Sequence, residues 1–170
     1  MLPKPTQKSV PPGLYTAAER ARRDATIWTV IQGVLAPLQF FVFLVSLALM
    51  ARYFWTGEGY GVATWSIVIK TLVLYTIMVT GAIWEKVVFG QYLFAPAFFW
   101  EDVFSFAVIA LHTAYLVALV AGRFDPQLLM LIALAAYAAY LINATQFVLK
   151  LRAARLQAAE GEMASDEVPA

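Results

Sequence analysis

The sequence predicts an all-α membrane protein, a bundle of four transmembrane helices with both termini in the cytoplasm. Three observations support this fold class. The chain of 170 residues is 62% hydrophobic and only 14% charged, it contains four long apolar stretches, and its basic residues gather near its two ends. A soluble domain of this length could not bury so much apolar surface, so the expected solvent is a lipid bilayer.

Each apolar stretch is long enough to cross a bilayer, because a helix needs about 20 residues to do so. The stretches cover approximately residues 27–53, 63–88, 97–120 and 128–149. Short links that contain glycine join the first stretch to the second and the third to the fourth. Four spans joined by short links are expected to form one bundle.

The polar ends complete the predicted domain organisation. We expect a polar N-terminal segment over residues 1–26, a transmembrane domain over 27–151 and a charged, disordered tail over 152–170. Within the first segment, Thr16 and Glu19 have the spacing of a capping box, which predicts the start of a short interfacial helix.

Lysine and arginine set the predicted orientation. Five of them precede the first span and three follow the fourth, whereas the first and third links carry only Arg52 and Arg123. Cytoplasmic flanks are enriched in these residues. Both termini, and the connector between the second and third spans, are therefore expected on the cytoplasmic side.

Composition excludes several classes of function. The chain has no cysteine, so it has no disulfide and no thiolate metal site. A net charge of +1 gives no overall field that would attract nucleic acid. The sequence contains no glycine-rich phosphate loop and no nucleophile elbow. Its single histidine, His112, cannot supply a bis-histidine haem site.

Three carboxylates, Glu85, Glu101 and Asp102, stand where the second and third spans come together. Charge is costly beside hydrocarbon, so ionisable residues at that depth indicate a functional site. One interpretation is a carboxyl group in a poorly solvated pocket that acts as proton donor or base. In the other, the carboxylates anchor the ends of the spans, with Glu85 offset by Lys86 and the other two favoured at a helix N-terminus.

The third span carries a polar face. Glu101 and His112 are eleven positions apart, which corresponds to about three turns of helix and a rise of about 16 Å. Ser105 and Tyr115 lie near the same stripe. His112 is either a ligand or proton donor in a buried pocket, or a packed histidine that bonds a neighbouring helix.

Other candidates lie around this face. The connector from Val87 to Trp100 is rich in aromatic residues, and Trp84 precedes it. Such a segment is typical of an interfacial aromatic belt or of a flat wall for a planar ligand. In the first span, Gln39 belongs to a polar stripe that should face the bundle, as structural hydrogen bonding or as a ligand contact. Lys70, inside the second span, is expected to extend its amine to the interface.

Five segments of the sequence are distinctive: Glu19–Asp24, Gln32–Phe40, Val79–Gly90, Phe94–Asp102 and His112–Tyr115. Together they resemble the 3-vinyl bacteriochlorophyllide hydratase family of anoxygenic phototrophic bacteria. The resemblance covers approximately residues 15–151, which is nearly everything except the two tails.

The resemblance implies an enzyme that adds water to the 3-vinyl group of chlorophyllide a, or of the related bacteriochlorin, to give a 3-(1-hydroxyethyl) group. No redox cofactor is expected, and the magnesium belongs to the substrate. The expected partners are the pigment, the lipid bilayer and, if another subunit closes the pocket, a second copy of the chain, with no nucleic acid. The expected location is the bacterial inner membrane, including the intracytoplasmic photosynthetic membrane.

Under this resemblance, Glu101 is expected to be the proton donor, and Asp102 or Glu85 the carboxylate that activates water. His112 is expected to ligate the substrate magnesium; if it is instead the acid, the carboxylates are structural. The remaining candidates for substrate contact are Tyr115, Ser105, Gln39, Trp84 and Trp100.

Two other functions would use some of the same features. A non-catalytic pigment-binding or assembly protein of the photosynthetic membrane would need the aromatic residues and His112, but no carboxylate at the edge of the ring. A small channel or transporter is disfavoured, because few polar groups line any one helix.

Overall fold

The computed structural model describes residues 14–166, with side chains described for residues 14–156. Five helices make up this part of the chain: α1 (Ala17–Ala25), α2 (Ile27–Thr56), α3 (Tyr60–Phe89), α4 (Phe99–Ala121) and α5 (Pro126–Asp166). The helices α2 to α5 are long and apolar enough to cross a membrane. The predicted all-α fold with four spans is confirmed.

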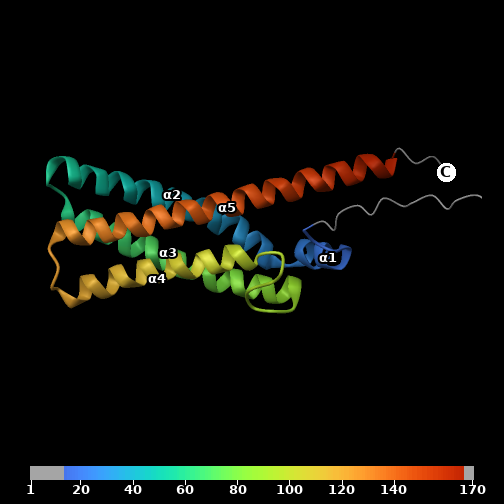
Figure 1. The fold of residues 1–170 in the computed structure, drawn as a ribbon, viewed down its shortest axis with the longest axis horizontal. Helices are drawn as coiled ribbons and strands as arrows, with labels where there is room; N and C mark the ends of the chain where they lie inside the picture. Colours follow the sequence, from blue (N-terminus) through green and yellow to red (C-terminus); the bar gives the residue numbers. More distant parts are fainter. Residues whose placement is uncertain (1–13, 167–170) are drawn as a thin grey trace, which may run out of the picture.

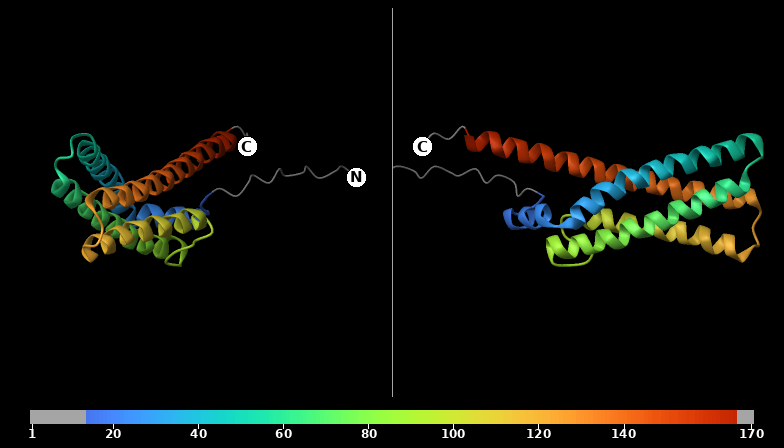
Figure 2. Two further views of the ribbon diagram at one scale, coloured as in Figure 1. Left: turned by 60° about the vertical axis from the view of Figure 1, so that its left-hand side comes forward. Right: turned by 180° about the vertical axis from the view of Figure 1, so that it is seen from behind.

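The long helices run alternately up and down, with α2 packed along α3 and α4 along α5 (Figure 1). The α2–α3 and α4–α5 links lie at one end of the bundle. Helix α1, the α3–α4 connector (residues 90–98) and the C-terminal part of α5 lie at the other, which we call the connector end (Figure 2). Both ends of the described chain therefore lie at the connector end, as an even number of spans requires.

The last helix is longer than the sequence suggested. It continues through Asp166, so the tail that we expected to be disordered over 152–170 is helical as far as the description extends. Residues 167–170, like 1–13, lie outside the described residues. The physical reason is local: this segment is rich in alanine, leucine, glutamate and arginine, which favour helix, and extending an existing helix needs no new nucleus.

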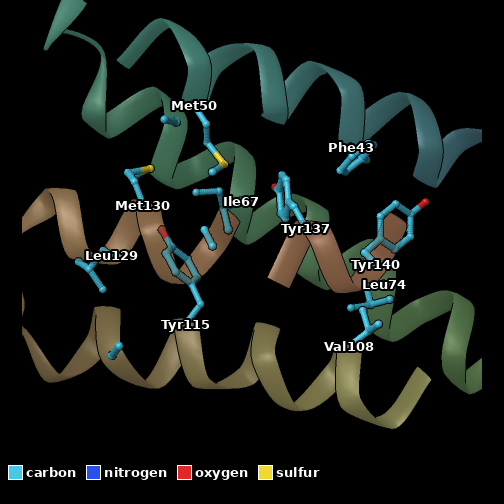
Figure 3. Close-up of a cluster of buried hydrophobic side chains, with 13 residues drawn as sticks. Phe43, Met50, Ile67, Leu74, Val108, Tyr115, Leu129, Met130, Tyr137 and Tyr140 are labelled. Atoms are coloured by element: carbon cyan, nitrogen blue, oxygen red, sulfur yellow. The ribbon is translucent and has the colours of Figure 1, made fainter. Parts of the chain in front are cut away.

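Toward the opposite end, the interior of the bundle is apolar. The ring of Phe43 on α2 lies 5.3 Å from that of Tyr137 and 5.0 Å from that of Tyr140, both on α5. Met50 and Met130 are buried in the same cluster (Figure 3). Lipid tails are as apolar as these side chains, so the cluster stabilises the bundle through close packing rather than through exclusion of water.

The polar stripe of α2 faces the bundle, as predicted. Gln39 and Ser46 are buried. The Ser46 hydroxyl is hydrogen-bonded to Tyr137 Oη at 2.6 Å and to Ser66 Oγ at 2.7 Å. Such hydrogen bonds tie α2 to α5 and to α3 where water is not available to satisfy the groups.

Helix α1 covers part of the connector end. Its predicted capping box is present: the Thr16 backbone N–H donates to Glu19 at 2.7 Å, and the Glu19 N–H donates to Thr16 Oγ1 at 3.3 Å. The Tyr15 ring stacks on Phe89 at 5.8 Å, and Arg22 Nε donates to the Val88 carbonyl at 2.7 Å. These contacts fasten α1 to the last turn of α3.

Substituting T16A should loosen α1 without unfolding the bundle, because an N-cap hydroxyl contributes about 1 kcal/mol to a helix. Hydrogen bonds from Thr16 lower the pKa of Glu19. The contribution of Glu19 is thus present above its ordinary pKa and lost as pH falls through the lowered one. Amide hydrogen exchange should show faster exchange in α1 of T16A, and in the wild type at low pH. The control T145A, on an exposed face of α5, should leave α1 unchanged; equal protection of α1 in T16A and wild type would contradict this role.

Candidate functional site

The carboxyl groups of Glu85 and Asp102 meet at the connector between α3 and α4. Both side chains are buried, and the two carboxyl groups lie close enough to interact. Glu85 Oε2 accepts a hydrogen bond from the Ala95 backbone N–H at 3.2 Å, and Asp102 Oδ2 accepts one from the Phe94 backbone N–H at 2.7 Å. We call Glu85 and Asp102 the carboxyl pair.

The carboxyl pair is built to hold a proton. Two buried carboxylates in contact repel each other, and one proton shared between them removes that repulsion. The negative charge that remains is stabilised by the backbone N–H groups of Phe94 and Ala95. An acid of this kind, shielded from water, can act as a general acid.

The connector is held in an unusual conformation by the same bonds. Phe94 has a φ of +59°, a left-handed conformation that non-glycine residues seldom adopt. Its ring stacks on Phe106 of α4 at 5.5 Å and lies 5.7 Å from Phe99. Phe94, Phe99, Trp100 and Phe106 are all exposed, Trp100 by 67%. We call these four residues the exposed aromatic face.

Glu101 lies apart from the carboxyl pair in its interactions. It is buried, and its Oε2 accepts from Lys150 Nζ of α5 at 2.6 Å. Lys150 also lies over the Phe98 ring, 5.1 Å from its centroid. Glu101 and Lys150 thus form an ion pair between α4 and α5, in which the Glu101 carboxylate is the acceptor.

Three other predicted residues lie inside the bundle. Ser105, one turn beyond Glu101, accepts from Asn143 Nδ2 at 2.8 Å, and Gln39 is buried on α2. Tyr115 lies further along α4 in the apolar cluster (Figure 3). Ser105 therefore lies near the carboxylates, whereas Tyr115 lies away from them.

The two predicted tryptophans lie on different surfaces. Trp84 is half-buried, packs on Phe89 and Phe98 at 5.7 Å between ring centroids, and donates from Nε1 to Thr29 Oγ1 at 2.9 Å. Trp100, by contrast, belongs to the exposed aromatic face. Only Trp100 is therefore placed to contact a ligand that approaches from lipid.

His112 forms a separate polar centre with Lys70. Lys70 Nζ lies 2.7 Å from His112 Nε2 and 3.9 Å from the centroid of the Tyr140 ring, and His112 Nδ1 bonds the Val108 carbonyl at 2.8 Å. The expectation that Lys70 reaches the interface is wrong: its side chain is fully buried, because a neighbouring helix supplies a partner. With both ring nitrogens engaged, His112 has no free position for a magnesium ion as it lies here.

Metal binding by the protein itself finds no support in the described part of the chain. No group of three histidine or carboxylate side chains there is arranged to hold a metal ion. The polar groups of the site are carboxyls, amides, the Ser105 hydroxyl and the Lys150 amine.

Comparisons with known proteins identify the family of the chain. The sequence profile of the 2-vinyl bacteriochlorophyllide hydratase family matches residues 15–153. The chain belongs to this family. A protein named 2-vinyl bacteriochlorophyllide hydratase from Rhodobacter capsulatus is 70% identical over 158 residues, covering 93% of this chain and 92% of the relative. One of the same name from Cereibacter sphaeroides is 70% identical over 154 residues, covering 90% of this chain and 96% of the relative.

The predicted resemblance to the hydratase family is thereby confirmed. No solved structure matches the chain.

The sequence interpretation missed two residues of α5 that contact the site. They are Lys150, which bonds Glu101 at 2.6 Å, and Asn143, which bonds Ser105 at 2.8 Å. A signal was present: Asn143, Gln146 and Lys150 recur at spacings of three and four, which places them on one face of a helix.

The pairing of Lys70 with His112 predicts non-additive effects on stability. H112L should cost about 3 kcal/mol, because it leaves a buried amine without its acceptor, and K70M about 1–3 kcal/mol, because His112 Nε2 loses its donor. The double variant should cost at least about 1 kcal/mol less than the sum, which is typical of residues in contact. Unfolding in mixed micelles measures all three. Additive costs would show that the two side chains do not act as a pair.

Proposed function

We infer that this chain hydrates the vinyl group of a vinyl bacteriochlorophyllide, the reaction for which its family and both relatives are named. It is a hydro-lyase of bacteriochlorophyll biosynthesis. The observation that carries this inference is 70% identity to two such hydratases over at least 90% of each chain. The buried carboxyl pair and the ion-paired Glu101 supply the acid and the base that hydration needs.

The chemistry requires one proton and one water. A proton is added to the terminal carbon of the vinyl group, and a cation forms on the carbon next to the ring, where the conjugated macrocycle spreads the charge. Water attacks that carbon and loses a proton to a base. The bond formed to oxygen and the new C–H bond replace the double bond, so no oxidant or reductant is consumed.

We assign proton donation to the carboxyl pair. Glu85 and Asp102 are buried in contact with each other, so the pair holds a proton that can be released to carbon. The backbone donors of Phe94 and Ala95 then stabilise the anion left behind. This reverses the assignment made from sequence, in which Glu101 was the donor.

We assign proton acceptance to Glu101. It is paired with Lys150 at 2.6 Å, and a carboxylate next to the site of attack can take the proton of the incoming water. The proton on Glu101 then returns to the carboxyl pair through solvent as the product leaves. A positive charge on the substrate cation is also stabilised by the nearby carboxylates.

The pigment is proposed to bind on the exposed aromatic face. Phe94, Phe99, Trp100 and Phe106 are exposed next to Asp102, and flat rings pack well against a planar macrocycle. The bilayer is the expected route of entry, in the bacterial inner membrane and its photosynthetic extensions. The magnesium arrives with the substrate, and no redox cofactor takes part in the proposed reaction.

Membranes that contain this protein should convert a vinyl chlorophyllide to its hydroxyethyl derivative in H₂¹⁸O. Mass spectrometry should show the gain of one labelled water, and the red absorption band should shift to the blue as conjugation is lost. Membranes without the protein are the control. Pigment that is bound but never gains a label would indicate a pigment-binding protein and would refute the hydratase.

Substitution of the carboxylates should separate catalysis from binding. E85Q, D102N and E101Q are each expected to lower kcat by at least about 100-fold, because general acid and base groups contribute 10²–10⁴. Pigment binding, measured by absorption and fluorescence, should persist. The matched control E58Q changes an exposed glutamate in the α2–α3 link and should retain full activity. Full turnover in all three variants would refute the acid and base roles proposed for these residues.

A further inference from the structure

Three amide side chains have buried oxygens without a hydrogen-bond partner among the described residues. They are Gln39 Oε1 on α2, and Asn143 Oδ1 and Gln146 Oε1 on α5. Gln39 and Asn143 are more than nine-tenths buried as whole residues. Leaving such groups unpaired costs free energy, and more so inside a membrane, so each one indicates a missing partner.

Rotating an amide does not remove the deficit. Exchanging the oxygen and nitrogen of Asn143 would let the Ser105 hydroxyl donate to the oxygen, but would leave the NH₂ group unpaired instead. Each amide thus needs a further polar partner in either orientation. The partner must be small, because packed helices surround the site.

The amides of α5 lie beside Glu101. Gln146 stands between Asn143, which bonds Ser105 at 2.8 Å, and Lys150, which bonds Glu101 at 2.6 Å. These two bonds join α4 to α5 along one face, and Gln146 lies on that face of α5, about one turn from each of the two bonded residues.

Gln39 approaches the same place from α2. Helices α2 and α5 are antiparallel (Figure 1), and their register is fixed where Phe43 packs against Tyr140 and Ser46 bonds Tyr137. One turn from this contact toward the connector end, Gln39 and Asn143 face each other across the bundle.

We propose that Gln39, Asn143 and Gln146 hold ordered water between α2 and α5, and that the water molecule next to Glu101 is the one the reaction adds. The proposal rests on the hydratase function. That water donates one hydrogen to an amide oxygen and the other to Glu101, which leaves a lone pair free to attack carbon. Glu101, the acceptor in the ion pair with Lys150, takes the proton as the C–O bond forms. The three amides are positioning residues, because they act on the water and not on the pigment.

A held water has a consequence in the product. The carbon that receives the hydroxyl group becomes a stereocentre, and the cation before it is planar. Water held on one side attacks one face, which gives one configuration. The pigment carries other stereocentres, so the two products are diastereomers and separate by chromatography.

The test is the epimer ratio of the product, measured with the full-length protein in membranes. N143L and Q146L replace an amide by an apolar group of similar size. Each should lower kcat by about 10–100-fold, the scale expected of a misplaced reactant, leave the KM for pigment unchanged, and move the product from one epimer toward a mixture. N143D, which keeps an acceptor oxygen at the same place, should restore one epimer.

Two controls make the result decisive. T71A removes a buried hydroxyl of α3 that bonds the Ile67 carbonyl of its own helix; it should lower stability but not change the epimer ratio. If N143L and Q146L fail to fold, the epimer ratio is measured with Q39L, which changes an amide on α2 instead of α5. A wild type that gives both epimers, or folded variants with unchanged ratios, would overturn the water site. A wild type that adds no water would instead refute the hydratase function.

Discussion

Two backbone N–H groups of the connector bond the two carboxyls at the ends of α3 and α4, and the site depends on these bonds. An irregular segment at the edge of a membrane must satisfy its backbone within the protein. Here Phe94 and Ala95 donate to Asp102 and Glu85. The same bonds bring the two carboxyls together, so the structural need of the connector and the acid chemistry of the site have a common cause.

Polar contacts between helices change along the bundle. Toward the connector end, α4 and α5 are joined by Glu101 with Lys150 and by Ser105 with Asn143. Between the two ends, Lys70 contacts His112, and toward the opposite end side chains such as Met50 and Met130 fill the interior. In a membrane, polar contacts between helices carry specificity that apolar packing lacks. The proposed chemistry lies at the connector end, where such contacts hold α4 and α5 together.

The sequence predicted the local features of the fold, but it did not predict which side chains pair between helices. The four spans and the capping box at Thr16 depend on neighbours in the chain, and both were predicted correctly. The position of the Lys70 amine depends on His112, 42 positions away, and Glu101 is paired with Lys150, 49 positions away. No periodicity within one helix reveals such a pair, so Lys70 was placed wrongly and Lys150 was overlooked.

The exposed aromatic face lies on the outside of a small bundle, and this affects how the enzyme meets its pigment. Phe94, Phe99, Trp100 and Phe106 are open to the surroundings of the helices, which for a spanning protein are lipid. A macrocycle that docks there arrives by lateral diffusion in two dimensions. The quantity that saturates the enzyme is then pigment per unit of membrane area rather than pigment per unit of volume, and added lipid dilutes the substrate as water would for a soluble enzyme.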